Sequence, residues 1–114
     1  MKTLNKKYGP WVLITGASSG IGKQYAINTA KGGLNTILVA RSTDKLEQLK
    51  KEITSLYKVK VKIITADLST EQGIQTVMQK SEEYEVGLLI NNAGREDSDH
   101  FFKISIEKHL QTID

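Results

Sequence analysis

The residues with the clearest chemical potential form a glycine- and serine-rich segment close to the N-terminus. A short apolar run leads directly into Thr15-Gly16-Ala17-Ser18-Ser19-Gly20-Ile21-Gly22. Gly16 permits a tight turn, Gly20 lets a phosphate approach the backbone, and Gly22 allows a following helix to pack closely on the strand. The free N–H groups and positive dipole end of that helix would face a pyrophosphate. The spacing therefore predicts a phosphate-binding turn.

Two other interpretations fit parts of this segment. A glycine-rich turn with no ligand has the same composition, so three glycines alone do not establish binding. A P-loop would use Gly22-Lys23 as its glycine-lysine pair, but it requires glycine at the position of Ala17 and serine or threonine at that of Gln24. The sequence therefore disfavours nucleoside triphosphate hydrolysis and leaves the ligand-free turn open.

The segment belongs to a chain in which short apolar runs alternate with stretches of helical period. The predicted strands are Trp11–Thr15, Thr36–Ala40, Val59–Ala66 and Val86–Ile90. The first, second and fourth runs are almost continuously apolar, which is typical of parallel strands covered on both faces. These runs are the frame that must position the glycine segment.

Between the predicted strands, apolar residues recur at helical spacing. The first helix is indicated by Tyr25, Ala26 and Ala30. The predicted core residues of the next two helices are Leu46, Leu49, Ile53 and Leu56, and then Ile74, Val77 and Met78. The candidate caps are Ser42 or Thr43 and Ser69 or Thr70, with Glu71 near a positive dipole end. A further helix is indicated by Ile106, Leu110 and Ile113.

Strands and helices that alternate in this way predict an α/β fold, a Rossmann-like, doubly wound parallel sheet with right-handed crossovers. A chain of 114 residues has room for one such core. If the crossovers reverse direction after the first strand, the ligand crevice lies at the carboxyl ends of the first and fourth strands. We expect residues 1–114 to form a partial domain, truncated after about four strands.

Polar motifs follow the other predicted strands. Arg41-Ser42 ends the second strand, Asp67-Leu68 the third, and Asn91-Asn92-Ala93-Gly94 the fourth. With the glycine segment, these motifs in this order resemble the short-chain dehydrogenase/reductase family from about Gly9 to the last residue. The runs Tyr8-Gly9-Pro10-Trp11 and Val39-Ala40-Arg41-Ser42 are similar to those of members that act on steroids or fatty acyl chains.

The resemblance implies cofactor-binding roles for residues of each motif. In the glycine segment these residues are Gly16, Ser18, Ser19, Gly20, Ile21 and Gly22. Asp67 would accept a hydrogen bond from the adenine amino group, and Leu68 would line its pocket. Asn91, Ala93 and Gly94 would border the adenosine ribose and the nicotinamide side. Asp67 could instead be a helix cap, and the asparagine-glycine run a plain turn.

The end of the second predicted strand indicates which dinucleotide is bound. An acidic residue there would favour NAD, because it accepts hydrogen bonds from the ribose hydroxyls. This chain has Arg41 instead, followed by Ser42 and, one helical turn onward, Lys45. A guanidinium can hold the 2′-phosphate of NADP with two hydrogen bonds. The sequence therefore predicts NADP as cofactor, although a solvated Arg41 at an exposed strand end is the simpler alternative.

The family resemblance implies hydride transfer between nicotinamide and a small carbonyl or alcohol substrate, with a proton handled by a Tyr-x-x-x-Lys pair. No lysine stands four residues after any of the tyrosines, Tyr8, Tyr25, Tyr57 and Tyr84. The family's catalytic serine lies just upstream of that tyrosine, so it too is expected outside this chain. We therefore assign no catalytic residue and expect an inactive fragment of an oxidoreductase that forms a homo-oligomer when complete. A cofactor-sensing or interaction protein with the same fold is the alternative.

Composition excludes several other classes. The chain has no cysteine, and His100 and His109 are too few for a metal cage. Residues 1–60 hold eleven Lys/Arg against three Asp/Glu, and residues 61–114 hold five against ten. No basic run exceeds two residues, however, which argues against nucleic-acid binding.

No segment has the length of a signal core or a membrane span, so a cytoplasmic location is expected. His100 is interpreted as a solvated loop residue, and Phe101-Phe102 as a cover for the crevice or a partner contact.

Overall fold

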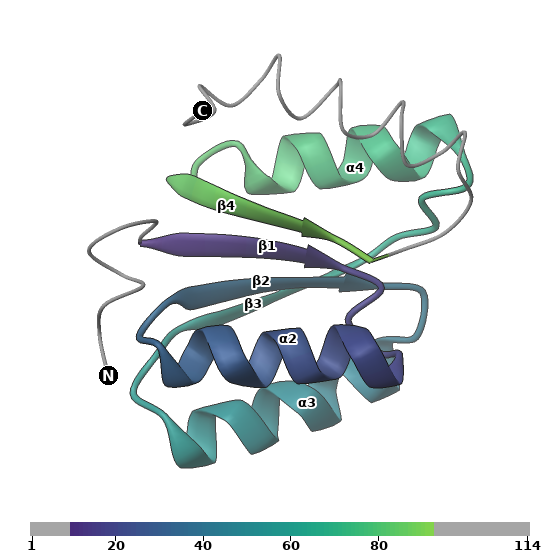
Figure 1. Ribbon diagram of the computed structural model, residues 1–114. Helices are drawn as coiled ribbons and strands as arrows, with labels where there is room; N and C mark the ends of the chain where they lie inside the picture. The colour runs from purple at the N-terminus through teal and green to yellow at the C-terminus, as the bar shows by residue number, and fades with distance from the viewer. Residues whose placement is uncertain (1–9, 93–114) are drawn as a thin grey trace.

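The structure is a computed structural model, and it describes residues 10–92. Along this part of the chain, parallel strands alternate with helices (Figure 1). The elements are β1 (Trp11–Thr15), α2 (Gly20–Lys31), β2 (Asn35–Ala40), α3 (Thr43–Leu56), β3 (Val61–Thr65), α4 (Glu71–Ser81) and β4 (Val86–Asn91). Each predicted strand is present, with ends that differ from the prediction by at most two residues. The fourth predicted helix, around Ile106, lies outside the described residues, as do His100 and Phe101-Phe102.

The strands form one parallel sheet in the order β3-β2-β1-β4. The chain moves outward from β1 to β2 and β3 and then returns to place β4 on the other side of β1. Thr15 at the end of β1 is in register with Val39 of β2 and Asn91 of β4, so the carboxyl ends of these strands lie together. The strand order reverses at β1, which is the condition under which a crevice was expected at the ends of the first and fourth strands. The crevice in the structure is lined mainly by residues at the ends of β1, β2 and β3, and Asn92 is its lining residue after β4.

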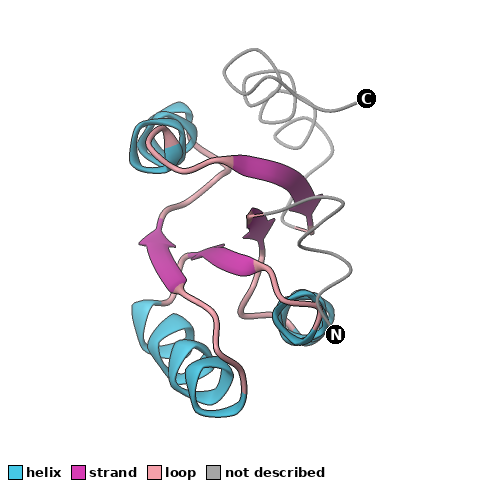
Figure 2. Ribbon diagram, turned by 90° about the vertical axis from the view of Figure 1, so that its left-hand side faces the viewer, coloured by secondary structure: helices cyan, strands magenta, loops and turns pink. Residues whose placement is uncertain are grey.

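Helices cover both faces of the sheet. Figures 1 and 2 show α2 and α3 on one face and α4 on the other. Under α2 and α3, residues such as Ile14, Leu38 and Ile53 form one buried cluster. On the α4 face, residues such as Ile37 and Val77 form a second cluster. The alternation of successive β2 residues between the two clusters is the two-residue period of a strand covered on both sides.

Two expectations about burial are corrected. Leu46, Leu49 and Ile53 are core residues as predicted, but Leu56 is 63% exposed, because it is the last residue of α3, where the helix leaves the sheet. The fourth run was predicted to be covered on both faces, yet every residue of β4 is only partly buried. In the sheet formed by residues 10–92, β4 is an edge strand, so it has a neighbouring strand, β1, on one side only.

Side-chain caps start the two later helices where the sequence places them. Ser42 caps α3 by accepting a hydrogen bond from the N–H of Lys45, and Thr70 caps α4 by accepting one from the N–H of Gly73. Glu71 lies in the first turn of α4, where its charge favours the helix dipole. Within residues 10–92, no helix is both long and apolar enough to cross a bilayer.

Candidate functional site

The glycine segment forms a tight turn between β1 and α2. Gly16 has a φ of 64°, a left-handed conformation that strongly favours glycine. Ser19 caps α2: its Oγ donates to the carbonyl of Gly16 (2.9 Å) and accepts from the N–H of Gly22 (3.1 Å). Ala17 continues the sheet by donating its N–H to the carbonyl of Val39 (3.1 Å). The turn is therefore held by its own backbone and by the neighbouring strand.

The other two glycines of the segment have different surroundings. A Cβ at Gly22 would overlap the carbonyl oxygen of Gly16 and lie 2.9 Å from Nδ2 of Asn92, so close packing of α2 requires glycine there. A Cβ at Gly20 would meet no non-neighbouring atom of residues 10–92 within 4 Å. Packing against the described protein therefore does not require glycine at position 20. An open backbone here is what the approach of a phosphate needs.

Asn92 joins the end of β4 to this turn. Its Nδ2 donates to Oγ of Ser19 (2.8 Å) and to the carbonyl of Gly16 (3.4 Å). Its backbone N–H donates to Oγ1 of Thr15 (2.9 Å), whose hydroxyl donates to Oδ1 of Asn91 (2.6 Å). The motif after the fourth strand implied a site role for Asn91 but not for Asn92. Only the return of β4 beside β1 brings Asn92 to the turn.

The carboxyl ends of the strands enclose a crevice of about 400 Å³. Its lining residues are Gly16, Ser18, Ser19, Val39, Ala40, Arg41, Ala66, Asp67, Leu68, Ser69 and Asn92. Six of these, from three of the four motifs, are predicted cofactor-binding residues. Val39, Ala40 and Ala66 were not predicted as site residues, because apolar strand residues carry no chemical signal and are recognised only once the strand ends meet.

Arg41 and Lys45 lie in adjacent hollows of the surface. Arg41 is exposed and lines the crevice at the end of β2. Ser42 accepts a hydrogen bond from the backbone N–H of Lys45 at 3.4 Å, so its hydroxyl proton remains for another acceptor. The side chain of Lys45 lines a separate groove between α2 and α3, and Ser18 borders both hollows. Lys45 is therefore beside the crevice but not in its wall.

Asp67 and Leu68 form the wall of the crevice at the end of β3. Oδ1 of Asp67 accepts hydrogen bonds from the N–H (2.9 Å) and the hydroxyl (2.6 Å) of Ser69. This turn orients the carboxylate, and Thr70 is the residue that caps α4, so the helix-cap interpretation of Asp67 is wrong. Leu68 is 9% exposed and packs into the cluster under α4.

The remaining predicted residues have other positions. Gly20, Ile21 and Gly22 form the first turn of α2, and Ile21 is 66% exposed beside the crevice. Asn91 ends β4 and contacts Thr15 instead of lining the crevice. Ala93 and Gly94 lie outside the described residues.

The chain is similar to known proteins of one family. Residues 10–114 match the family model described as short chain dehydrogenase. A very-long-chain 3-oxoacyl-CoA reductase from Scheffersomyces stipitis is 43% identical over 100 residues, which cover 86% of this chain and 29% of that protein. The human protein named inactive hydroxysteroid dehydrogenase-like protein 1 is 42% identical over 92 residues, covering 80% of this chain and 28% of that protein.

A solved structure shows the same fold. The short-chain dehydrogenase from Sphingobium yanoikuyae in complex with NADPH aligns with a TM-score of 0.70 and 41% identity over 75% of this chain and 34% of that one. The chain thus spans less than a third of the length of these two curated relatives. The glycine turn, the strand order and the family match together show that the chain belongs to the short-chain dehydrogenase/reductase family.

Proposed function

We propose that the crevice binds the adenosine and pyrophosphate part of NADP(H), in a protein that transfers hydride between nicotinamide and a small carbonyl or alcohol substrate. The observation that carries the proposal is the convergence of the glycine turn, Arg41 and Asp67 on a single hollow. The glycine turn, a cation and an oriented carboxylate line this hollow together with apolar residues. This combination matches the parts of a phosphorylated nucleotide.

The pyrophosphate would lie against the first turn of α2. This turn has no acidic side chain, and its backbone is open at Gly20. The N–H groups at the start of a helix and the positive dipole end favour an anion at this position. Asn92 supports the site indirectly, because it fixes the hydroxyl of Ser19 that caps the helix.

The adenosine would occupy the part of the crevice between β2 and β3. Leu68 and Ala66 offer an apolar wall for the adenine, and Asp67 would accept a hydrogen bond from its amino group. Arg41 at the end of β2 would hold the 2′-phosphate, and the hydroxyl of Ser42 would donate to it. These contacts favour NADP over NAD.

The described residues bind and orient the cofactor in this proposal. Bound NADPH would supply the hydride in carbonyl reduction, and bound NADP+ would accept it in alcohol oxidation. No tyrosine of the chain has a lysine at the fourth following position, so we propose no catalytic residue among residues 1–114. The partly buried strand β4 is consistent with further pairing in a larger protein or a homo-oligomer.

A second candidate is a protein that binds the cofactor without turnover. A relative that is 42% identical carries the word inactive in its name, which favours this alternative. The two candidates share the crevice and differ only in chemistry. Cofactor binding combined with no oxidation or reduction of any carbonyl or alcohol tested in the full-length protein would favour the second.

The test is calorimetric titration of NADP, NADPH and NAD into the full-length protein. We expect NADP to bind more tightly than NAD by about 2 to 3 kcal/mol, the range of a hydrogen bond to a charged group. Equal affinities for NADP and NAD would contradict the assignment of Arg41 to the 2′-phosphate. Absence of binding to all three would contradict the proposed site itself.

A further inference from the structure

A charged groove runs between α2 and α3, next to the crevice. It has a volume of about 280 Å³, and its ionisable side chains are Lys23 of α2 with Lys45 and Glu52 of α3. Ser18 lines both the groove and the crevice, so the two hollows adjoin at the glycine turn. Lys45 of the groove also lies close to the end of β2, because its backbone N–H donates to Oγ of Ser42 (3.4 Å), the residue that follows Arg41. The groove therefore lies next to the position proposed for the 2′-phosphate.

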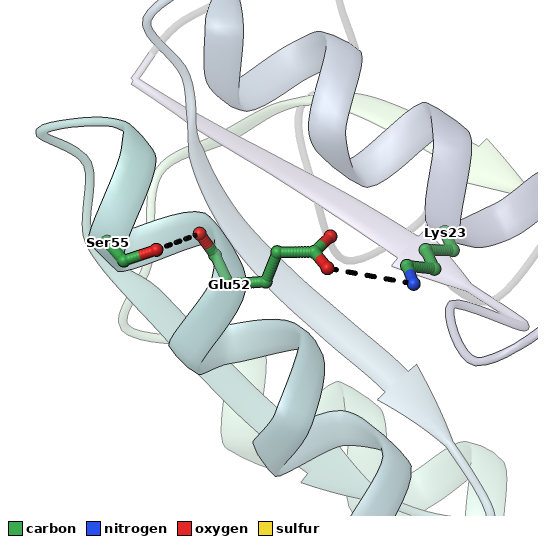
Figure 3. A network of polar contacts seen from close by, with 3 residues as sticks. All are labelled: Lys23, Glu52 and Ser55. Carbon is green, nitrogen blue, oxygen red and sulfur yellow. Dashed lines mark hydrogen bonds and ion pairs between the residues drawn. The ribbon is translucent and has the colours of Figure 1, made fainter.

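Two of the three charged side chains are paired with each other. Nζ of Lys23 lies 3.8 Å from Oε1 of Glu52, and the two side chains are 50% and 42% exposed. Figure 3 shows them reaching toward one another from neighbouring helices, while the hydroxyl of Ser55 bonds the backbone carbonyl of Glu52 (2.8 Å) and not its carboxylate. Lys45 makes no ion pair with any residue between 10 and 92. Lys45 is therefore the lysine of the groove whose charge is not paired with a carboxylate of residues 10–92.

The positions of the two lysines are unfavourable for their helices. Lys23 is the fourth residue of α2 and Lys45 the third residue of α3, both near a positive dipole end. A cation at a helix start interacts unfavourably with the helix dipole. Of these two helices, α3 has an acidic residue, Asp44, in its first turn, and α2 has none. The helix dipole therefore does not favour lysine at either position.

We propose that the Lys23–Glu52 pair sets the charge felt by the 2′-phosphate and so tunes the preference for NADP over NAD. While Lys23 holds Glu52, the carboxylate is compensated and Lys45 remains available to the phosphate. If Lys23 loses its charge, Glu52 competes for Lys45 and repels the phosphate. If Glu52 loses its charge, both lysines favour the phosphate. This inference depends on the proposed NADP site.

The opposite signs of these two effects provide the test. Adenosine 2′,5′-bisphosphate and adenosine 5′-monophosphate differ only in the 2′-phosphate, so the ratio of their affinities isolates that group. We would titrate both into full-length unmutated protein, Lys23→Gln, Glu52→Gln and the double variant. We expect Glu52→Gln to raise the ratio about two- to five-fold and Lys23→Gln to lower it by a similar factor. The double variant should lie between the two, and all differences should shrink at high ionic strength.

A matched control and a stability measurement make the result interpretable. Glu47→Gln removes the same charge from α3 at an exposed position outside the groove, and it should leave the ratio within error of the unmutated value. Thermal unfolding of each variant reports whether the pair matters only for structure. A purely structural pair would change both affinities together and leave their ratio constant, which would overturn the inference.

The failure of the inference can be separated from the failure of the proposed function. If the unmutated protein does not prefer the bisphosphate, the 2′-phosphate site is wrong and the inference falls with it. If the unmutated protein prefers the bisphosphate but the two single variants leave the ratio unchanged or shift it in the same direction, only the inference is wrong.

Discussion

Two strand-to-helix turns of this protein are built in the same way and differ in charge. In the turn after β1, Ser19 caps α2 and donates to the carbonyl of Gly16, and Gly22 packs against that carbonyl. In the turn after β3, Thr70 caps α4 and donates to the carbonyl of Asp67 (2.9 Å). In both turns the capping hydroxyl lies three residues after the carbonyl, and the close glycine three residues after the cap.

The two helix starts differ in the charges around them. The first turn of α2 has no acidic side chain and an open backbone at Gly20. The start of α4 is preceded by Asp67 and carries Glu71 in its first turn, so its positive dipole end already faces carboxylates. The capping hydroxyl and the close glycine, which both turns share, join each helix closely to the strand before it. The absence of negative charge at α2 is what makes that turn a candidate anion site, because dipole and N–H groups are equally present in both.

The largest expected effect is a loss of stability when the close glycine that both turns share is replaced by alanine. A Cβ at Gly22 or at Gly73 would overlap the carbonyl oxygen of Gly16 or Asp67, respectively. Gly22→Ala and Gly73→Ala should each lower the free energy of unfolding by about 2 to 4 kcal/mol, measured by urea denaturation. Gly20→Ala, which meets open space, is the control and should change it by less than about 1 kcal/mol. A Gly22→Ala variant as stable as the unmutated protein would contradict the close-packing argument.

The next effect concerns Arg41, the cation that lines the same crevice as the glycine turn. Arg41→Asp replaces a guanidinium by a carboxylate where the 2′-phosphate is proposed, so the preference of about 2 to 3 kcal/mol for NADP should largely disappear. The measurement is calorimetric titration of NADP and NAD. Arg41→Lys keeps the charge without the two-pronged geometry and should retain an intermediate preference. An unchanged preference in Arg41→Asp would show that Arg41 is only a solvated residue.

A third prediction breaks the charge difference between the turns. Ile21→Glu puts a carboxylate into the first turn of α2, as Glu71 does in α4, at a side chain that is 66% exposed. Affinity for NADP should fall by about 1 to 2 kcal/mol, while the free energy of unfolding should stay within about 1 kcal/mol of its unmutated value. Ile21→Gln removes the same apolar side chain without the charge. If the Gln and Glu variants bind equally, charge at this turn does not decide binding.

The smallest effect compares the two caps. Ser19→Ala and Thr70→Ala should each lower the free energy of unfolding by about 1 kcal/mol, because each leaves a helix N–H without its partner. Only Ser19→Ala should also weaken NADP binding, because Ser19 lines the crevice and is held by Asn92. Paired denaturation and titration experiments separate the two outcomes. Equal loss of NADP affinity in both variants would remove the distinction between the turns.

Much of the architecture was predictable from local sequence. The apolar runs and caps placed every strand and the starts of α3 and α4 within about two residues, because burial on two faces and capping leave direct marks on residue type. Leu56 was misplaced because a helical repeat shows which face a residue is on but not where the helix leaves the sheet. The glycine turn was predicted because its conformations exclude most other residues.

The sequence by itself determined the fold family, the order of the motifs and the kinds of side chain available at each strand end. The tertiary structure decided which of them meet: it brought Asn92 to Ser19 from 73 residues away, and it built the crevice wall from Val39, Ala40 and Ala66. It also placed Lys45 in a groove with Lys23 and Glu52 instead of in that wall. Spacing along the chain specifies local turns and faces, whereas contacts between distant residues depend on how the strands are ordered in the sheet.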